Sequence, residues 1–256
     1  MIIYFSATGN NKYVASKIAE ATNDHIVSIT ECLKHNDLSF SLDTNENFGL
    51  VIPTYFGGFP KIVIDFLKAS TIKLSNNNYV FFIGTYGAEA GNICKEAEKR
   101  LATLGKAPDA TFTIKMVDNW IPYFDMNDKD YIATAESTAE TMLSEVVNSI
   151  VSHSKEKDYG KGMPAITQKL ATLYYGMSCN TKKFSVNDTC VGCGICERQC
   201  PISAIKITKG KPDWIKSKCT LCLGCVHRCP KNAISYTEKT KGHGQYFNPH
   251  VEPDQI

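Results

Sequence analysis

The chain has 256 residues, of which 43% are hydrophobic and 21% charged, with a formal net charge of +2 at pH 7. This is the composition of an ordinary globular protein, and no apolar run approaches the roughly 18–20 residues that cross a bilayer. The N-terminus, MIIYFSATGN, has neither a basic region nor a cleavage site. We therefore expect no export, a cytoplasmic chain and no membrane partner.

The net charge conceals an asymmetry along the chain. Residues 1–181 carry 16 Lys and Arg against 20 Asp and Glu, whereas residues 182–256 carry 12 against 6. A small basic region can bind nucleic acid or an acidic protein. Because this region also holds the cysteine repeats described below, we expect its positive charge mainly to offset an anionic prosthetic group, and we expect no nucleic-acid partner.

Five short apolar runs in the first 150 residues predict strands, and segments of helical period lie between them. The expected strands are Ile2–Phe5, His25–Thr30, Gly49–Pro53, Tyr79–Gly84 and Phe112–Val117. The last expected helix runs from Ile132 to Ile150 on a stripe of apolar residues three or four apart. Strands that alternate with helices predict a parallel sheet covered on both faces.

A glycine turn, SATGNN, joins the first predicted strand to the first predicted helix. A helix N-terminus favours phosphate because its first N–H groups lack partners and the helix dipole is positive there. The turn has neither the GK[ST] of a P-loop nor the GxGxxG fingerprint, and a site without Lys or Arg suits a monophosphate. The candidate phosphate ligands are Ser6, Thr8, Gly9, Asn10 and Asn11.

Two further glycine-rich loops follow the third and fourth predicted strands, at the edge where open α/β sheets bind ligands. They are PTYFGGFP from Pro53 and GTYGAEAGN from Gly84. Glycines let the backbone approach a flat ring while aromatic side chains cover its face; plain loop packing is the alternative. The candidate contacts are Pro53, Thr54, Tyr55, Phe56, Gly57, Gly58, Thr85, Tyr86, Gly87, Gly91 and Asn92.

Together, SATGN, TYFGG and TYG resemble the flavodoxin family over about 150 residues. The resemblance implies a doubly wound five-stranded parallel sheet in the order 2-1-3-4-5 and bound FMN, with the peptide of Gly57 or Gly58 beside the reactive flavin nitrogen. The family usually has Ser or Thr where Asn11 stands, so one hydroxyl contact to the phosphate is lost. The segment VDNWIPYF would emerge beside the flavin, where Trp120 lines a partner or substrate surface or packs in its loop.

The middle of the chain reads as a connection between two domains. We expect residues 1–152 to form the first domain. Residues 153–183 are charged, contain glycine and become amphipathic around Leu170 to Tyr175, which indicates a linker with one short helix or a docking segment. Residues 184–240 hold the cysteine repeats, and residues 241–256 are expected to form a tail with little structure of its own.

Two copies of the pattern C-x2-C-x2-C-x3-C-P lie in the last third of the chain. They are CVGCGICERQCP from Cys190 and CTLCLGCVHRCP from Cys219. Paired zinc sites would typically show separated CxxC pairs or Cys mixed with His. Three cysteines at this spacing can instead wrap one corner of an iron–sulfur cubane, and the fourth, before proline, points toward a second cluster.

Residues 184–240 therefore resemble a bacterial two-cluster ferredoxin, a small α+β domain, including the segments ISAIKI and KNAISY after each proline. The resemblance implies two [4Fe–4S] clusters. A domain of about 57 residues has too little core to fold well alone, so loss of iron should unfold it. The expected ligands are Cys190, Cys193, Cys196 and Cys229 for cluster 1, and Cys200, Cys219, Cys222 and Cys225 for cluster 2.

Two further groups of residues receive simpler predictions. Cys32, Cys94 and Cys179 stand alone and are expected to be buried, inert thiols. Six lysines of the repeat domain either meet the acidic first domain or an acidic redox partner, or are only solvated. They are Lys206, Lys209, Lys211, Lys216, Lys218 and Lys231.

These features predict an electron-transfer flavo-iron–sulfur protein that relays electrons between FMN, the two clusters and low-potential partners of ferredoxin or flavodoxin type in anaerobic metabolism. No general acid–base pair or activated nucleophile is visible, which favours a carrier. The alternative is a flavin-dependent reductase whose small acceptor docks near Tyr55, Phe56, Tyr86 and Trp120. A nucleic-acid or metal-binding module is a third hypothesis, and the sequence leaves a homodimer open.

Overall fold

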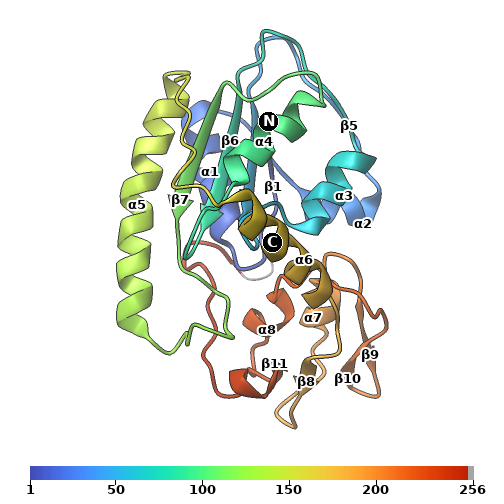
Figure 1. The fold of residues 1–256 in the computed structure, drawn as a ribbon. Helices are drawn as coiled ribbons and strands as arrows, with labels where there is room; N and C mark the ends of the chain where they lie inside the picture. The colour runs from blue at the N-terminus through green and yellow to red at the C-terminus, as the bar shows by residue number, and fades with distance from the viewer. Residues whose placement is uncertain (253–256) are drawn as a thin grey trace.

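A five-stranded parallel sheet forms the centre of the first domain in the computed structural model, which describes residues 1–252 (Figure 1). The strand order is β2-β1-β4-β6-β7, which is 2-1-3-4-5 when these five strands are counted along the chain. The predicted flavodoxin-like topology is confirmed. The strands are β1 Ile2–Tyr4, β2 Ile26–Ser28, β4 Phe48–Pro53, β6 Val80–Tyr86 and β7 Ala110–Lys115.

Helices cover both faces of this sheet. On one face α1 (Asn10–Thr22) and α5 (Lys129–Val151) pack against the strands, and on the other lie α2 (Ile29–His35), α3 (Lys61–Ala69) and α4 (Ile93–Ala102). Because both faces are covered, β1 and β4 are buried almost throughout. This explains why the strands appear in the sequence as apolar runs without alternation.

The local differences from prediction have simple causes. The sequence predicts a strand from His25 to Thr30, but β2 ends at Ser28, whose side chain accepts a hydrogen bond from the N–H of Glu31 (3.4 Å) and so begins α2. A parallel pair, β3 (Ser39–Ser41) with β5 (Thr71–Lys73), is absent from the prediction. Three residues are too few to show a period.

The cysteine-rich region has two small antiparallel pairs and two short helices, as its resemblance predicts. Strand β8 (Phe184–Val186) pairs with β11 (Ile234–Tyr236), and β9 (Ile205–Thr208) pairs with β10 (Lys211–Trp214). Helices α7 (Ile195–Arg198) and α8 (Gly224–His227) each carry the third cysteine of a repeat, and a 3-10 turn, η1 (Glu238–Thr240), follows β11. The segments ISAIKI and KNAISY supply β9 and β11.

Helix α6 (Ala165–Ser178) crosses between the two domains (Figure 1). The Tyr175 hydroxyl accepts a hydrogen bond from the N–H of Lys61 (3.2 Å) and donates one to the carbonyl of Thr220 (2.9 Å). At 14 residues the helix is longer than the short one predicted. Its outward side exposes Ile166, Leu170, Leu173, Tyr174 and Met177.

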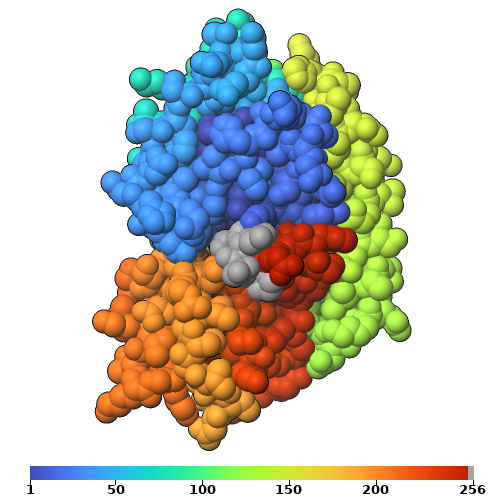
Figure 2. Space-filling model, turned by 180° about the vertical axis from the view of Figure 1, so that it is seen from behind, coloured from blue at the N-terminus to red at the C-terminus, as the bar shows by residue number. Residues whose placement is uncertain are grey.

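The C-terminal segment packs between the domains although it has no helix or strand from Lys241 to Glu252. The N–H of Asn248 donates to the carbonyl of Thr8 (2.8 Å). Figure 2 shows this segment, in red, beside the N-terminal region in blue and the cysteine-rich region in orange. The remainder of the predicted tail, 253–256, lies outside the described residues.

An apolar cluster that includes Val117, Tyr175, Leu223 and Tyr236 joins the two domains. Within residues 1–252, none of the helices combines the length and the hydropathy that a bilayer span requires.

Candidate functional site

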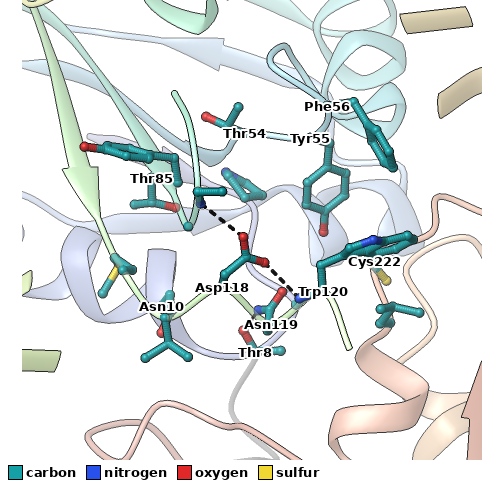
Figure 3. Close-up of a pocket in the computed structure, with 18 of the residues that line it drawn as sticks. Thr8, Asn10, Thr54, Tyr55, Phe56, Thr85, Asp118, Asn119, Trp120 and Cys222 are labelled. Atoms are coloured by element: carbon teal, nitrogen blue, oxygen red, sulfur yellow. Dashed lines mark hydrogen bonds between the residues drawn. The ribbon is translucent and has the colours of Figure 1, made fainter. Parts of the chain in front are cut away.

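A cavity of about 430 Å³ lies between the carboxyl ends of the sheet strands and the cysteine-rich domain (Figure 3). This volume falls within the range of small-molecule and cofactor sites. Three loops that are far apart in the sequence meet there, as the predicted edge of the sheet requires. The predicted residues that line it are Ser6, Thr8, Asn10, Asn11, Pro53, Thr54, Tyr55, Phe56, Gly57, Thr85, Tyr86 and Gly87.

The two asparagines that begin α1 are oriented by protein donors. The hydroxyl of Thr85 donates to Asn11 Oδ1 (2.7 Å), and Tyr246 Oη and Asn248 Nδ2 donate to Asn10 Oδ1 (3.0 and 3.1 Å). An amide whose oxygen is bound still has its NH₂ donors to offer. The first-turn N–H groups add donors without intrahelical partners. The start of α1 can therefore bind an anion without Lys or Arg.

Four predicted contact residues, Gly9, Gly58, Gly91 and Asn92, do not line the cavity. A Cβ atom on Gly9 would lie 2.8 Å from Asn248 Cβ, so this glycine faces the C-terminal segment. A Cβ atom on Gly91 would lie 2.4 Å from Gly57 Cα, so Gly91 is needed where the two loops touch. These residues lie outside the cavity lining, in the loops that form its wall.

The turn at residues 55–58 presents aromatic rings between the domains. Phe56 and Gly57 both have positive φ (52° and 80°), and the backbones of Tyr55 and Gly58 exchange hydrogen bonds (2.9 and 3.1 Å), the geometry of a type I′ turn. The Phe56 ring stacks on Tyr175 with centroids 5.3 Å apart. The Gly57 carbonyl accepts from the N–H of Asn92 (2.9 Å), so a flip of that peptide would break a hydrogen bond.

The loop after β7 is a part of the site that the predicted contact set omits. Met116, Val117, Asp118, Asn119 and Trp120 all line the cavity. The Asp118 carboxylate accepts from the N–H groups of Ala88 and Trp120, each at 3.0 Å (Figure 3). Burial raises its pKa. The only signal in the sequence was the segment's place after the fifth strand.

The second cysteine repeat forms another wall that sequence reasoning missed. Leu221, Cys222 and Leu223 line the cavity. Both leucines have positive φ (55° and 56°), a conformation that costs a non-glycine residue roughly 1–2 kcal/mol. The first repeat has Gly192 and Gly194 at the matching positions, also at positive φ. The replacement of glycine by leucine was the signal that could have found this wall.

His227 attaches the second repeat to two other segments. Its Nε2 lies 2.8 Å from the carbonyl oxygen of Asn119, and its Nδ1 accepts from the N–H of Tyr246 (3.2 Å). Asn119 Nδ2 in turn donates to Thr8 Oγ1 (2.6 Å). Burial lowers the pKa of His227 to about 4, so the ring is neutral at pH 7. Hydrogen bonds through Asn119 thus connect the SATGNN turn, the predicted phosphate loop, with the second repeat.

The structure brings the eight repeat cysteines together in two sets of four. Each set surrounds a small cavity, and the fourth cysteine of each repeat lies at the cavity of the other repeat. Within residues 1–252, no three Cys, His, Asp or Glu side chains converge tightly enough for a single metal ion, and all eleven thiols are free. The predicted ligand assignment stays a prediction, which this grouping supports. The sets are Cys190, Cys193, Cys196 and Cys229, and Cys200, Cys219, Cys222 and Cys225.

The residues of the large cavity fit FMN. Thr54 Oγ1 is buried at its edge and has no hydrogen-bond partner among the described residues. Such a hydroxyl costs roughly 1–3 kcal/mol, and a polar atom of a bound flavin would satisfy it. Donors at the start of α1 can bind the phosphate of FMN, and aromatic rings between the two domains can pack against its flat ring.

The lone thiols and the lysines can also be placed. Cys32, Cys94 and Cys179 are buried, as predicted, and burial raises the pKa of Cys94 to about 12. Within residues 1–252, none of the six lysines forms an ion pair with the first domain; Lys211 instead pairs with Asp188 (2.7 Å) in its own domain. Acidic residues of the first domain therefore do not form ion pairs with these lysines.

Comparison with known families identifies both domains. Residues 1–140 match the model of the flavodoxin domain, which is more than half of the chain. The chain belongs to the flavodoxin family. Residues 189–234 match the 4Fe-4S dicluster domain, so the protein is a flavodoxin–ferredoxin fusion. Its cofactors are FMN and two [4Fe–4S] clusters, which make it an electron-transfer flavo-iron–sulfur protein.

Curated proteins and solved structures do not extend this family assignment. No curated protein matches the chain. Among solved structures, a flavodoxin of Streptococcus pneumoniae is 14% identical, with 56% of this chain and 97% of that chain covered and a TM-score of 0.35. Rubredoxin oxygen:oxidoreductase of Desulfovibrio gigas is 15% identical over 58% of this chain and 36% of that one, with a TM-score of 0.34. At these values the likenesses carry no argument about activity.

Proposed function

We propose that this flavodoxin–ferredoxin fusion relays electrons between FMN and an external redox protein through its clusters in series, with cluster 2 beside the flavin. The observation that carries the proposal is the position of Cys222. Its side chain lines both the large cavity and the cavity surrounded by the cluster 2 cysteines. Bound FMN can hold two electrons whereas each cluster passes one, so the pair suits a relay.

The protein groups around the large cavity position and shield rather than transfer protons. Asp118 is engaged by two backbone N–H groups, which fix the loops at 85–91 and 116–120 relative to each other. Phe56 and Trp120 pack with ring centroids 5.6 Å apart beside the wall made by the second repeat. These contacts exclude water from the region between the two cofactor sites.

The first repeat lies toward solvent, which supports its role as the contact with the partner. Cys193 is exposed, and Val191, which lies between the first two cysteines of this repeat, is 62% exposed. Lys231, which lines the small cavity of this repeat, is exposed, and so are Lys206 and Lys209 of the same domain. Basic residues at an interface select acidic partners and speed their association. We therefore infer that a low-potential, acidic redox protein meets the chain at the first repeat.

The proposal is tested with anaerobically purified protein whose flavin and iron are quantified. A reduced acidic two-cluster ferredoxin is mixed with it in a stopped-flow instrument, and flavin absorbance is followed. The Cys196→Ala variant should keep its flavin and cluster 2, yet take up electrons at least about tenfold more slowly. Cys94→Ala, which changes a buried thiol of the first domain, is the control. An unchanged rate in Cys196→Ala would contradict the series order.

The same preparation separates a carrier from a flavin-dependent reductase. A carrier exchanges electrons only with protein partners, and each mixing event ends when flavin and clusters are reduced. Multiple turnovers with a small acceptor such as a quinone, at a rate that depends on Trp120, would favour the reductase. We also propose the domain limits 1–152, 153–183 and 184–240, which limited proteolysis of the holoprotein can check.

A further inference from the structure

The seam between the domains buries one guanidinium group without a carboxylate. Arg228 is 7% exposed. Its Nε donates to the carbonyl of Ala7 (2.8 Å), Nη2 to that of Ser6 (3.4 Å) and Nη1 to Gln199 Oε1 (2.8 Å). All three acceptors are neutral, and within residues 1–252 Arg228 forms no ion pair with Asp or Glu. Its positive charge therefore lacks a carboxylate partner.

A buried cation of this kind is costly unless an anion compensates it. The effective penalty for an unpaired buried charge is several kcal/mol, and arginine does not lose its proton to escape the penalty. Phosphate-loop carbonyls provide hydrogen bonds but no net negative charge. Some other group near the guanidinium has to supply that charge.

The nearest candidates are the thiolates of the second repeat. A Cβ atom on Gly224 would lie 3.5 Å from Ala7 O, 3.7 Å from Cys222 Sγ and 3.9 Å from Arg228 Nε. The phosphate loop, the thiolate and the guanidinium thus surround one point. A [4Fe–4S] cluster with four thiolates carries a formal charge of about −2, which is the compensation that Arg228 lacks.

We propose that Arg228 is the counter-cation of the cluster held by Cys200, Cys219, Cys222 and Cys225, and that it couples this cluster to the FMN phosphate loop. The inference rests on the proposed function, because it requires that cluster at that place. Reduction adds a negative charge in a region of low dielectric, where a nearby cation stabilises it. Arg228 therefore raises the reduction potential of cluster 2, and its bonds to Ser6 and Ala7 hold the loop in its anion-binding shape.

The first repeat offers an internal contrast. Gln199 stands there at the position that Arg228 has in the second repeat, immediately before the fourth cysteine. The preceding Arg198 is exposed and bonds the carbonyl of Cys193 (3.1 Å). Cluster 1 thus lacks a buried arginine at the matching position, so the charge effect should fall on one cluster of the two.

Three variants of the full chain separate the two roles of Arg228. Arg228→Gln removes both the positive charge and the guanidinium that donates to two carbonyls. It should lower the reduction potential of cluster 2 alone and raise the Kd of FMN about tenfold. Arg228→Lys keeps the charge but cannot reach both carbonyls, so it should weaken FMN with little change in potential. Gln199→Glu places a carboxylate beside the guanidinium, so it should lower the potential while FMN binding persists.

The measurements are a redox titration followed by EPR and, for FMN, recovery of flavin fluorescence on dilution. Arg198→Gln, at the exposed arginine of the first repeat, should change neither quantity. If Arg228→Gln fails to load its clusters, Gln199→Glu and Arg228→Lys still decide the question. Unshifted potentials in Gln199→Glu with full iron and flavin would overturn this inference alone, whereas a wild-type chain without iron would overturn the proposed function as well.

Discussion

The two cysteine repeats share one spacing and one short helix each, but they differ in the residues between their cysteines. The first carries glycine at both positive-φ positions, an exposed arginine and a neutral glutamine, and it lies toward solvent. The second carries Leu221 and Leu223 at strained positions, and buried His227 and Arg228. The cysteine pattern is set by cluster chemistry, whereas the residues between the cysteines are set by what each cluster faces. The second repeat is shaped as a wall of the large cavity.

The strongest test of this contrast removes one ligand from each repeat. Cys196→Ala and Cys222→Ala should each lose about half of the iron, because each removes one thiolate of one cubane. Only Cys222→Ala should also lose flavin, because Cys222 lines the large cavity, where we propose that FMN binds. Iron, sulfide and flavin are quantified in anaerobic preparations. Equal flavin retention in both variants would remove the basis for placing cluster 2 beside the flavin.

Exchange of the residues at the positive-φ positions of the two repeats should give the next largest effect. In Gly192→Leu, the new Cβ would lie 2.7 Å from the carbonyl oxygen of Gly210 and φ is 66°, so we expect a loss of about 2–3 kcal/mol and poor loading of cluster 1. Leu221→Gly relieves strain instead. It also removes a side chain that is only 4% exposed, so the net result should be a loss of about 1–3 kcal/mol. It should raise the Kd of FMN several-fold as well, because the cavity loses part of its wall.

A smaller effect is expected from the residues that follow the third cysteine of each repeat by two positions. His227→Ala leaves the Asn119 carbonyl and the Tyr246 N–H without their partner, and should cost about 1–3 kcal/mol. Arg198→Ala changes an exposed side chain and should stay within about 0.5 kcal/mol. Thermal unfolding of the holoproteins measures both. Equal losses of stability in the two variants would show that the hydrogen bonds of His227 do not stabilise the second repeat.

The smallest effect concerns the wall opposite the second repeat. Thr54→Val replaces a buried hydroxyl that has no partner in the described chain. Without FMN the variant should be about 1 kcal/mol more stable than wild type, since the unsatisfied group is gone. With FMN it should bind the cofactor several-fold more weakly. A variant that binds FMN as well as wild type would show that Thr54 does not contact the flavin.

Much of the fold and part of the site could be predicted from the sequence. Buried strands, the turn before α1 and the cysteine spacing are local patterns, and each was visible in a short window. The walls made by Asp118, Asn119 and Leu223 left weaker signals, which were the place of one segment after the fifth strand and leucine where the first repeat has glycine. Neither signal by itself distinguishes a residue that faces a cavity from one that packs in a loop. Gly58, Gly91 and Asn92 show the converse, since they lie in the correct loops but behind the cavity wall.

The sequence by itself determined which cofactors this chain binds, because chelation and phosphate binding depend on residue types at short spacing. Only the tertiary structure decided which cysteine repeat forms a wall of the large cavity and which side chains stand beside it. That arrangement depends on contacts such as Arg228 with Ala7, which are 221 positions apart in the chain. Such contacts arise from the packing of two separately patterned domains, and no local period encodes them.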